Sequence, residues 1–172
     1  MKIYLAGPSV FSADWEAQAA AMKAACARRG AIGLYPFDNA LLRPADPFEH
    51  GLAIFARDRD SVLECDGVVA DFSPFRGASA DVGTVWEFAF AQGVGKAVAA
   101  FSRDRRDYGE RLPEFWTPSA TEDVEAFGMA DGLMLVGSNL DGNPERRGQT
   151  VGGLFGSFDE ALDACLGELR LR

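Results

Sequence analysis

The sequence is poor in the residues that metal sites and disulfide frameworks need. Of its 172 residues one is a histidine, His50, and three are cysteines, none of them in a C-x-x-C pair. A single histidine excludes a multi-histidine metal site, and any Ser-His-Asp triad would have to use His50. An odd number of scattered cysteines offers no disulfide framework and favours a reducing cytoplasm. We therefore expect a cytoplasmic protein without a metal site.

Positive charge and long hydrophobic runs are also scarce. The chain carries 17 Lys and Arg against 26 Asp and Glu, a formal charge of -9. This balance opposes binding to a nucleic-acid backbone, which is neutralised by Lys and Arg. The apolar run at residues 3–6 is too short for a signal peptide, and no stretch approaches the roughly 20 apolar residues of a membrane helix. The expected partner is a small molecule, with no nucleic-acid polymer and no membrane.

What the chain does have is hydrophobic residues, at 48%, enough for one domain over residues 1–172. Short apolar runs alternate with segments that begin at capping residues such as Ser12, Asp46, Asp81 and Ser157. Alternating strands and helices predict an α/β fold, a doubly wound five-stranded parallel sheet in a flavodoxin-like three-layer sandwich. The expected strands lie at 3–6, 32–35, 67–71, 97–101 and 133–136, and the expected helices at about 13–29, 47–65, 81–93 and 158–171. Residues 102–128 and 137–153 are expected to be irregular.

Ligands in such folds bind outside the carboxyl ends of the strands. The residues there are Gly7-Pro8, Asp38-Asn39, the loop 71–77 and Ser102. Neither a Gly-Lys-Ser/Thr phosphate loop nor a G-x-G-x-x-G dinucleotide motif occurs, so the usual nucleotide folds are disfavoured. With one histidine in the chain, acid and base groups must be mainly carboxylates.

Glu87 is the first candidate, since it is the single acid within the apolar segment 83–90. A carboxylate in an apolar helix is costly unless it is used or paired. It is either a nucleophile or the partner of Arg76 or Lys96 in a salt bridge.

Four further residues each have two interpretations. Asp81 can cap the helix that follows it, bind a ligand, or do both. Asp58 lies in a mixed charge run that is typical of a solvated helix face, and an active-site role competes with that interpretation. Tyr4 is either a core residue or a partner of Glu87. Arg76 either binds an anion or pairs with an acid at a turn.

Taken together, several ordered blocks resemble the nucleoside 2-deoxyribosyltransferase family. The similarity covers most of the chain, and the joint order of the blocks is more specific than any one of them. The blocks are Lys2–Pro8 with Phe11, Pro36–Asn39, Cys65–Gly77, Asp81–Glu87 with Gly95-Lys96, and a late segment at 124–129 with Leu133–Leu135.

The resemblance implies a role for each of the four acidic or phenolic candidates. Glu87 would be the nucleophile on the anomeric carbon of 2-deoxyribose, and Tyr4 would hold and tune its carboxylate. Asp81 would bind the sugar, and Asp58 would bind the nucleobase and assist its protonation. The reaction implied is transfer of 2-deoxyribose between nucleobases by double displacement, through a covalent deoxyribosyl-glutamate and with net retention. The substrates would be a deoxynucleoside and a free nucleobase, and no cofactor is required.

Further contacts with substrate would come from the matched blocks. The family is usually oligomeric, which implies a hexamer or dimer in which the late segment of a neighbouring subunit, here including Met134, closes each site. The substrate-binding residues expected on this basis are Gly7, Phe11, Asp38, Phe75, Arg76, Gly83, Asp131 and Met134.

One departure concerns the sugar end of the site. Family members usually have asparagine two residues before the methionine, where it reaches the sugar 5′-hydroxyl of the neighbouring subunit. Here that position is Gly132, preceded by Asp131. Either Asp131 replaces the asparagine or 5′ recognition differs. Ala40, after Asp38-Asn39, likewise offers no amide for base selection.

Three other functions compete with transfer. The first is hydrolysis of the N-glycosidic bond of 2′-deoxynucleosides or deoxynucleoside 5′-monophosphates, with Ser9 and Ser12 as phosphate donors. The second is phosphoribohydrolase chemistry, because residues 83–87 fit a G-T-x-x-E core, although the Pro-Gly-Gly that usually precedes it is absent. The third is a nucleotide sensor without catalytic activity.

Overall fold

The computed structural model describes the chain except for residues 39–43, 118, 120–122 and 125. A parallel sheet of four strands forms its centre, in the order β2-β1-β3-β4. The strands are β1 (Lys2–Ala6), β2 (Ile32–Leu34), β3 (Gly67–Asp71) and β4 (Ala97–Phe101). All residues of β3 and β4 are buried, as the continuous apolar runs predicted.

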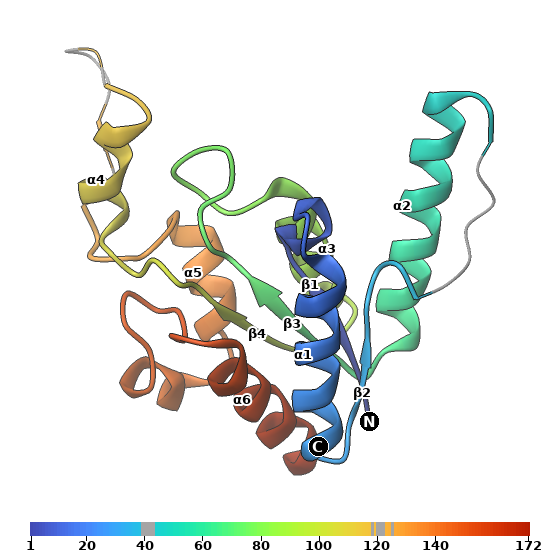
Figure 1. Cartoon of the computed structure of the whole chain (residues 1–172). Helices are drawn as coiled ribbons and strands as arrows, with labels where there is room; N and C mark the ends of the chain where they lie inside the picture. The colour runs from blue at the N-terminus through green and yellow to red at the C-terminus, as the bar shows by residue number, and fades with distance from the viewer. Residues whose placement is uncertain (39–43, 118, 120–122, 125) are drawn as a thin grey trace.

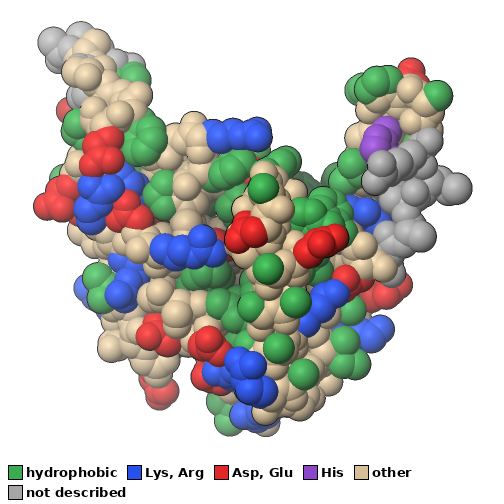
Figure 2. Space-filling view, in the orientation of Figure 1, with side chains coloured by type: hydrophobic (Ala, Val, Ile, Leu, Met, Phe, Trp, Pro, Cys, Tyr) green, Lys and Arg blue, Asp and Glu red, His purple; other side chains and the backbone are tan. Residues whose placement is uncertain are grey.

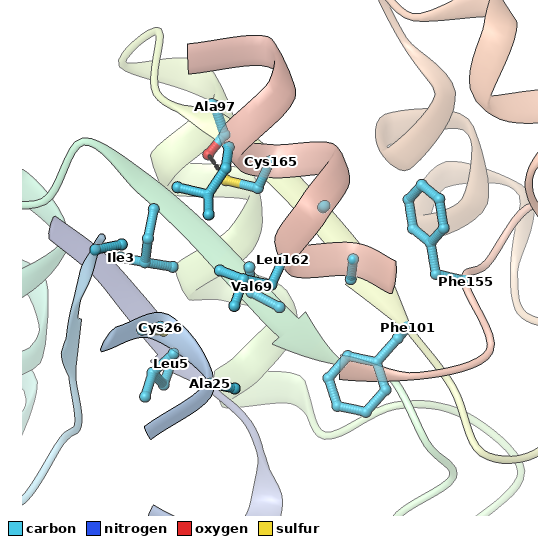
Figure 3. Close-up of a cluster of buried hydrophobic side chains, with 14 of the residues drawn as sticks. Ile3, Leu5, Ala25, Cys26, Val69, Ala97, Phe101, Phe155, Leu162 and Cys165 are labelled. Atoms are coloured by element: carbon cyan, nitrogen blue, oxygen red, sulfur yellow. Dashed lines mark hydrogen bonds between the residues drawn. The ribbon is translucent and has the colours of Figure 1, made fainter. Parts of the chain in front are cut away.

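Helices cover both faces of this sheet (Figure 1). Because side chains alternate along a strand, Ile3 and Leu5 point to one face and Tyr4 and Ala6 to the other. The first face packs against α1 (Trp15–Arg28) and α6 (Phe158–Leu171), and Figure 3 shows this cluster around Val69, Leu162 and Cys165. The second face packs against α2 (Pro47–Glu64), α3 (Val82–Gly93) and α5 (Leu133–Leu140).

The predicted fifth strand at 133–136 is wrong, because this segment is the first turn of α5. A four-residue apolar run does not distinguish a buried strand from a helix that buries one face. In the helix Val136 and Asn139 are buried, whereas Leu133 and Met134 are exposed.

The outer edge of β4 is hydrogen-bonded without a fifth full strand. The amide of Asn139 accepts from the backbone nitrogen of Ala100 at 2.7 Å, and Arg146 donates to the carbonyl oxygen of Val98 at 2.6 Å. Phe155 forms a single parallel bridge to Phe101. These three contacts satisfy the edge of the sheet, which would otherwise expose unpaired backbone groups.

Three of the four predicted helix caps are confirmed. Asp46 accepts from the backbone nitrogens of Phe48 and Glu49, Asp81 from Thr84, and Ser157 from Glu160. The prediction for Ser12 is wrong. Its hydroxyl donates to Asp14, which occupies the N-cap position, and the helix begins at Trp15.

The two segments predicted to be irregular contain short helices. Residues 102–128 include α4 (Tyr108–Arg111) and the 3-10 helix η2 (Leu112–Glu114), and residues 137–153 include the end of α5 and η3 (Pro144–Gly148). A further 3-10 helix, η1 (Pro8–Phe11), follows β1. Helices this short have too few turns to show an apolar period in the sequence. Within the described ranges no helix has the length and hydropathy to cross a membrane.

Candidate functional site

Helices α2 and α3 lie side by side and line a pocket of about 330 Å³. On each helix the lining residues are spaced three and four positions apart, so they share one face. Most of them are apolar or glycine, and two are carboxylates. The lining residues are Gly51, Ile54, Phe55 and Asp58 from α2, and Gly83, Trp86 and Glu87 from α3.

Glu87 is held at this pocket by Tyr4. The phenolic hydroxyl of Tyr4, fully buried on β1, donates to Oε1 of Glu87 at 2.7 Å. The pKa of Glu87 is raised to about 7, above all by burial; the hydrogen bond from Tyr4 lowers it, and the neighbouring Asp58 and Asp81 raise it. Burial, above all, and the charge of Glu87 raise the pKa of Tyr4 far above its usual range, so the phenol stays protonated and remains a donor.

Asp58 is the second carboxylate of the pocket, with 17% of its side chain exposed. Arg57 contacts it through Nε at 3.0 Å and a terminal nitrogen at 2.9 Å, both to Oδ1. Burial raises the pKa of Asp58, and the hydrogen bond and charge of Arg57 lower it. Two acids therefore line one small pocket, and a buried phenol donates a hydrogen bond to one of them.

Asp81 caps α3 with one oxygen, and no hydrogen-bond partner of the other is found among the described residues. Its Oδ2 accepts from the backbone nitrogen of Thr84 at 2.9 Å and from the Thr84 hydroxyl at 3.0 Å. Gly83 is part of this arrangement, because a β-carbon at position 83 would come within 3.1 Å of that oxygen. Capping and ligand binding are thus compatible at Asp81.

Neither cation that the sequence offered as a salt-bridge partner reaches Glu87. Lys96 donates to the carbonyl oxygens of Leu63 and Cys65, at the end of α2. Arg76 lies over the rings of Phe11 and Phe75, at 4.9 and 4.6 Å from their centroids. The salt bridges to Arg76 or Lys96 that the sequence allowed for Glu87 are therefore not formed.

Several of the other predicted substrate residues gather at a second hollow, of about 300 Å³, beyond the ends of β1 and β3. Phe11 and Phe75 line it and stack on each other with centroids 5.2 Å apart. Arg76, which covers this pair, has a left-handed backbone with φ 55°. Gly7 lies beside it, where a β-carbon would come within 3.0 Å of the β-carbon of Asp71. Its lining does not overlap that of the pocket with Glu87.

Three predicted substrate-binding residues, Asp38, Met134 and Asp131, do not line either hollow. Asp38 forms an ion pair with Lys23 and accepts from the backbone nitrogen of Tyr35 at 2.8 Å. Met134, at the start of α5, has 73% of its surface exposed. Asn39 and Ala40, the expected base-selecting positions, fall outside the described residues.

Asp131, the third, is buried and engaged inside its own chain. It accepts from the Ser79 hydroxyl at 2.5 Å and from the backbone nitrogens of Ala80 and Gly132 at 3.0 and 2.7 Å. These bonds join α5 to the loop after β3. Both carboxylate oxygens of Asp131 thus accept hydrogen bonds within its own chain.

The sequence interpretation missed Arg57 and the apolar walls of the pocket. Arg57 belongs to the run 57–60, whose mixed charges are typical of an exposed face. The spacing of the residues could have indicated the pocket. Ile54 and Asp58 on one helix, and Gly83 and Glu87 on the other, are each four residues apart and so share a helix face. Within the described ranges, no three His, Cys, Asp or Glu side chains group as metal ligands.

Known proteins resemble this chain in sequence and in fold. A 2-desoxiribosyltransferase from Leishmania mexicana superimposes with a TM-score of 0.70 and 32% identity, covering 93% of both chains. A 2-deoxyribosyltransferase from Bacillus psychrosaccharolyticus gives 0.54 and 22%, covering 80% of this chain and 82% of that one. At this lower identity the likeness concerns the fold alone.

A curated relative and a family model extend the comparison. An uncharacterised protein of Schizosaccharomyces pombe is 33% identical over 116 residues, which are 66% of this chain and 55% of the relative. This chain therefore spans about half the length of that relative. The model of the nucleoside 2-deoxyribosyltransferase family matches residues 3–135, which include Tyr4, Asp58, Asp81 and Glu87. The chain belongs to the nucleoside 2-deoxyribosyltransferase family, a family of enzymes.

Proposed function

We propose that this protein transfers 2-deoxyribose from a deoxynucleoside to a free nucleobase, with Glu87 as the nucleophile. The observation that carries the proposal is the hydrogen bond of 2.7 Å from Tyr4 to Glu87, in a pocket that also holds Asp58. Tyr4 holds Oε1 of Glu87, and no partner among the described residues is recorded for Oε2. A positioned carboxylate with one open oxygen suits attack on an anomeric carbon.

In the first half-reaction Oε2 of Glu87 forms a bond to C1′ while the N-glycosidic bond breaks. The bonding electron pair leaves with the nucleobase, and Asp58 supplies the proton that the departing base needs. In the second half-reaction a nitrogen of the incoming base attacks C1′ from the face that the first base left. The ester bond to Glu87 breaks, its electron pair returns to the carboxylate, and Asp58 takes up the proton of the incoming base. Two inversions at C1′ give net retention.

A 2-deoxy sugar favours this route because it lacks the electron-withdrawing 2′-hydroxyl. Its anomeric carbon therefore carries positive charge readily in the transition state. The intermediate must then be protected from water. Ile54, Phe55 and Trp86 form the walls of the pocket. We propose that these side chains pack around the bound base and limit the entry of water.

The pKa of Glu87 has a direct consequence for this mechanism. Glu87 attacks only when it is ionised, and burial raises its pKa to about 7. We therefore expect the acid limb of kcat/KM to rise with pH through this range, and kcat/KM to fall again where Asp58 has lost the proton that it must donate. Because Asp58 lies in the same pocket, the apparent value belongs to the pair of carboxyl groups.

We propose that a second copy of the chain completes the site. Met134 and Leu133, at the start of α5, have 73% and 41% of their surfaces exposed. Large apolar side chains are also exposed along α2, at Phe48, Leu52 and Phe55, and Figure 2 shows hydrophobic side chains where this helix stands clear of the body. The 5′-hydroxyl would be recognised without an asparagine at 132 and without Asp131.

Transfer and hydrolysis are separated by the dependence on acceptor base. Deoxyinosine is incubated with and without adenine, and hypoxanthine and deoxyadenosine are measured by chromatography. The proposal expects deoxyadenosine to form in step with hypoxanthine, and hypoxanthine release to slow strongly when adenine is omitted. Release that is equally fast without adenine, with free deoxyribose as the product, would show a hydrolase instead.

A further inference from the structure

Arg57 is a charged side chain beside the pocket that the proposed mechanism does not use. Its side chain is 11% exposed, and it lies on α2 beside Asp58. Burying a guanidinium is costly unless its donors meet acceptors. One terminal nitrogen of Arg57 is buried and has no acceptor at hydrogen-bonding angles among the described residues, although Asp58 lies 2.9 Å from it. Because this buried nitrogen lacks a well-aligned hydrogen bond, Arg57 is poorly placed to stabilise the fold, and a functional role is the more economical interpretation.

The contacts of Arg57 are one-sided. Both Nε and the terminal nitrogen approach Oδ1 of Asp58, at 3.0 and 2.9 Å. No partner is recorded for Oδ2 among the described residues, and Asp58 lines the pocket. On its other side the guanidinium lies 5.9 Å from the ring centroid of Phe37. Arg57 is thus wedged between an aromatic ring and one oxygen of Asp58, and the other oxygen remains for the ligand.

Every other charged or titratable group recorded around this pair is an acid or a phenol. Glu87 and Asp81 approach from α3, and Tyr4 approaches from β1. Arg57 is the sole cation among the groups that influence Glu87 and Asp58 in the described part of the chain. Without it, no charge among the described groups would oppose burial at Asp58, and at Glu87 only the hydrogen bond from Tyr4 would oppose burial and repulsion.

We propose that Arg57 is a positioning residue that orients Asp58 toward the leaving nucleobase and keeps it able to release its proton. This inference rests on the proposed function of the pocket. A general acid must hold its proton at the working pH and still give it up to the substrate. The positive charge of Arg57 favours loss of the proton from Asp58. Its planar guanidinium holds Oδ1 of Asp58, so that Oδ2 faces the base.

The chain offers a matched control two residues away. Arg59 contacts Asp60 through Nε at 2.9 Å and a terminal nitrogen at 2.7 Å, again to one oxygen, on the same helix. This pair is exposed, with 42% and 56% of its side chains accessible. The Arg59 guanidinium also lies 5.9 Å from the ring centroid of Phe55. Arg59→Met therefore removes the same kind of ion pair from α2 without touching Asp58, and it keeps an apolar side chain beside Phe55.

The test measures kcat/KM for nucleobase release from deoxyinosine in the presence of adenine, over pH 5 to 9. Release is counted whether the sugar goes to adenine or to water. We expect Arg57→Met to lower the maximum by about 10- to 100-fold and to move the profile to higher pH. Arg57→Lys keeps the charge but not the fork, so its profile should stay in place while its maximum falls. Arg59→Met should match the wild type. An Arg57→Met profile that coincides with that of Arg59→Met would overturn the proposal.

A double-mutant cycle with Asp58→Asn shows whether Arg57 acts through Asp58. In the background of Asp58→Asn, the additional change Arg57→Met should cost less than about twofold, because the group that Arg57 positions is already inactive. An equal loss in both backgrounds would contradict the proposal. If Arg57→Met does not fold, Arg57→Lys carries the same cycle. Release that ignores adenine would refute transfer and leave the inference on Arg57 intact, and a wild type that releases no base would refute the proposed function itself.

Discussion

Two hollows in this molecule differ in how their charged groups are neutralised. The larger, of about 660 Å³, lies between α6 and residues 142–149, and its arginine and two of its acids form ion pairs. Arg146 there donates to two backbone carbonyls and to Glu168, and Asp163 pairs with Arg29. The smaller hollow, between α2 and α3, holds Glu87 with a phenol as its hydrogen-bond donor. On this comparison we propose the smaller hollow as the site of chemistry, because it holds an incompletely neutralised acid.

The largest expected effect tests the structural side of this comparison. Arg146→Met removes the donor to Val98 and Asn139 and leaves Glu168 without this partner. Breaking a buried charge pair of this kind should lower the free energy of unfolding by about 3 kcal/mol or more. Urea denaturation followed by circular dichroism measures this loss. The neighbouring Arg147, which is exposed, supplies the control Arg147→Met, with an expected change within about 0.5 kcal/mol.

The same variant also sharpens the comparison in function. At a temperature where Arg146→Met is folded, its kcat/KM should equal that of the wild type, because Arg146 lies at the edge of β4 and not among the residues that line the pocket with Glu87. A specific loss of turnover in the folded variant would connect the two hollows and contradict the distinction drawn between them.

A somewhat smaller effect is expected at the hollow with Glu87, where the free energy of unfolding should depend on pH. The pKa of Glu87 is raised from 4.5 to about 7 in the folded protein. Its protonated form is therefore favoured by folding, and this contribution is present below pH 4.5 and lost as the pH rises through 7. Glu87→Gln, which stays neutral, should be more stable than the wild type at pH 8.5 by up to about 3 kcal/mol. At pH 4 the difference should nearly vanish. Thermal unfolding at both pH values measures it, with the exposed Glu64→Gln as control.

The smallest effect concerns the hydrogen bond to Glu87. Tyr4→Phe removes the donor that lowers the pKa of Glu87. The acid limb of kcat/KM should move to higher pH by about one pH unit, so that activity falls more at pH 6 than at pH 8.5. A uniform loss at all pH values would mean that Tyr4 acts by packing and does not tune the carboxylate. Tyr35→Phe, whose hydroxyl lies near Ser9, is the matched control.

The sequence predicts the four strands and the main helices because each has a clear pattern of apolar residues and a recognisable start. It fails at 133–136, where a short apolar run fits a strand and a helix equally well. The side chains that replace the fifth strand, Asn139 and Arg146, act through contacts distant in sequence. No local pattern announces contacts of this kind.

At the site, the sequence indicates Glu87 because an acid in an apolar helix is unusual. Tyr4, on a strand distant in sequence, joins it only in the folded chain. Asp58 gains weight from the family resemblance, and the structure lines the same pocket with it. Asp131 was expected to contact substrate, but in the structure it accepts hydrogen bonds from the loop after β3. These bonds depend on tertiary contacts that the sequence does not reveal. Residue type alone does not distinguish an acid that lines a pocket from an acid that accepts hydrogen bonds between two segments of the chain.

The most direct test of the central claim is mass spectrometry of the protein after incubation with a 2′-fluoro-2′-deoxynucleoside. Fluorine at C2′ withdraws electrons from the anomeric carbon, so the glycosyl-enzyme breaks down slowly and accumulates. We expect wild-type protein to gain one fluorodeoxyribosyl group on the peptide that carries Glu87, and Glu87→Gln to gain none. Rapid release of base with no adduct, or an adduct on a different residue, would contradict the assignment of Glu87 as nucleophile.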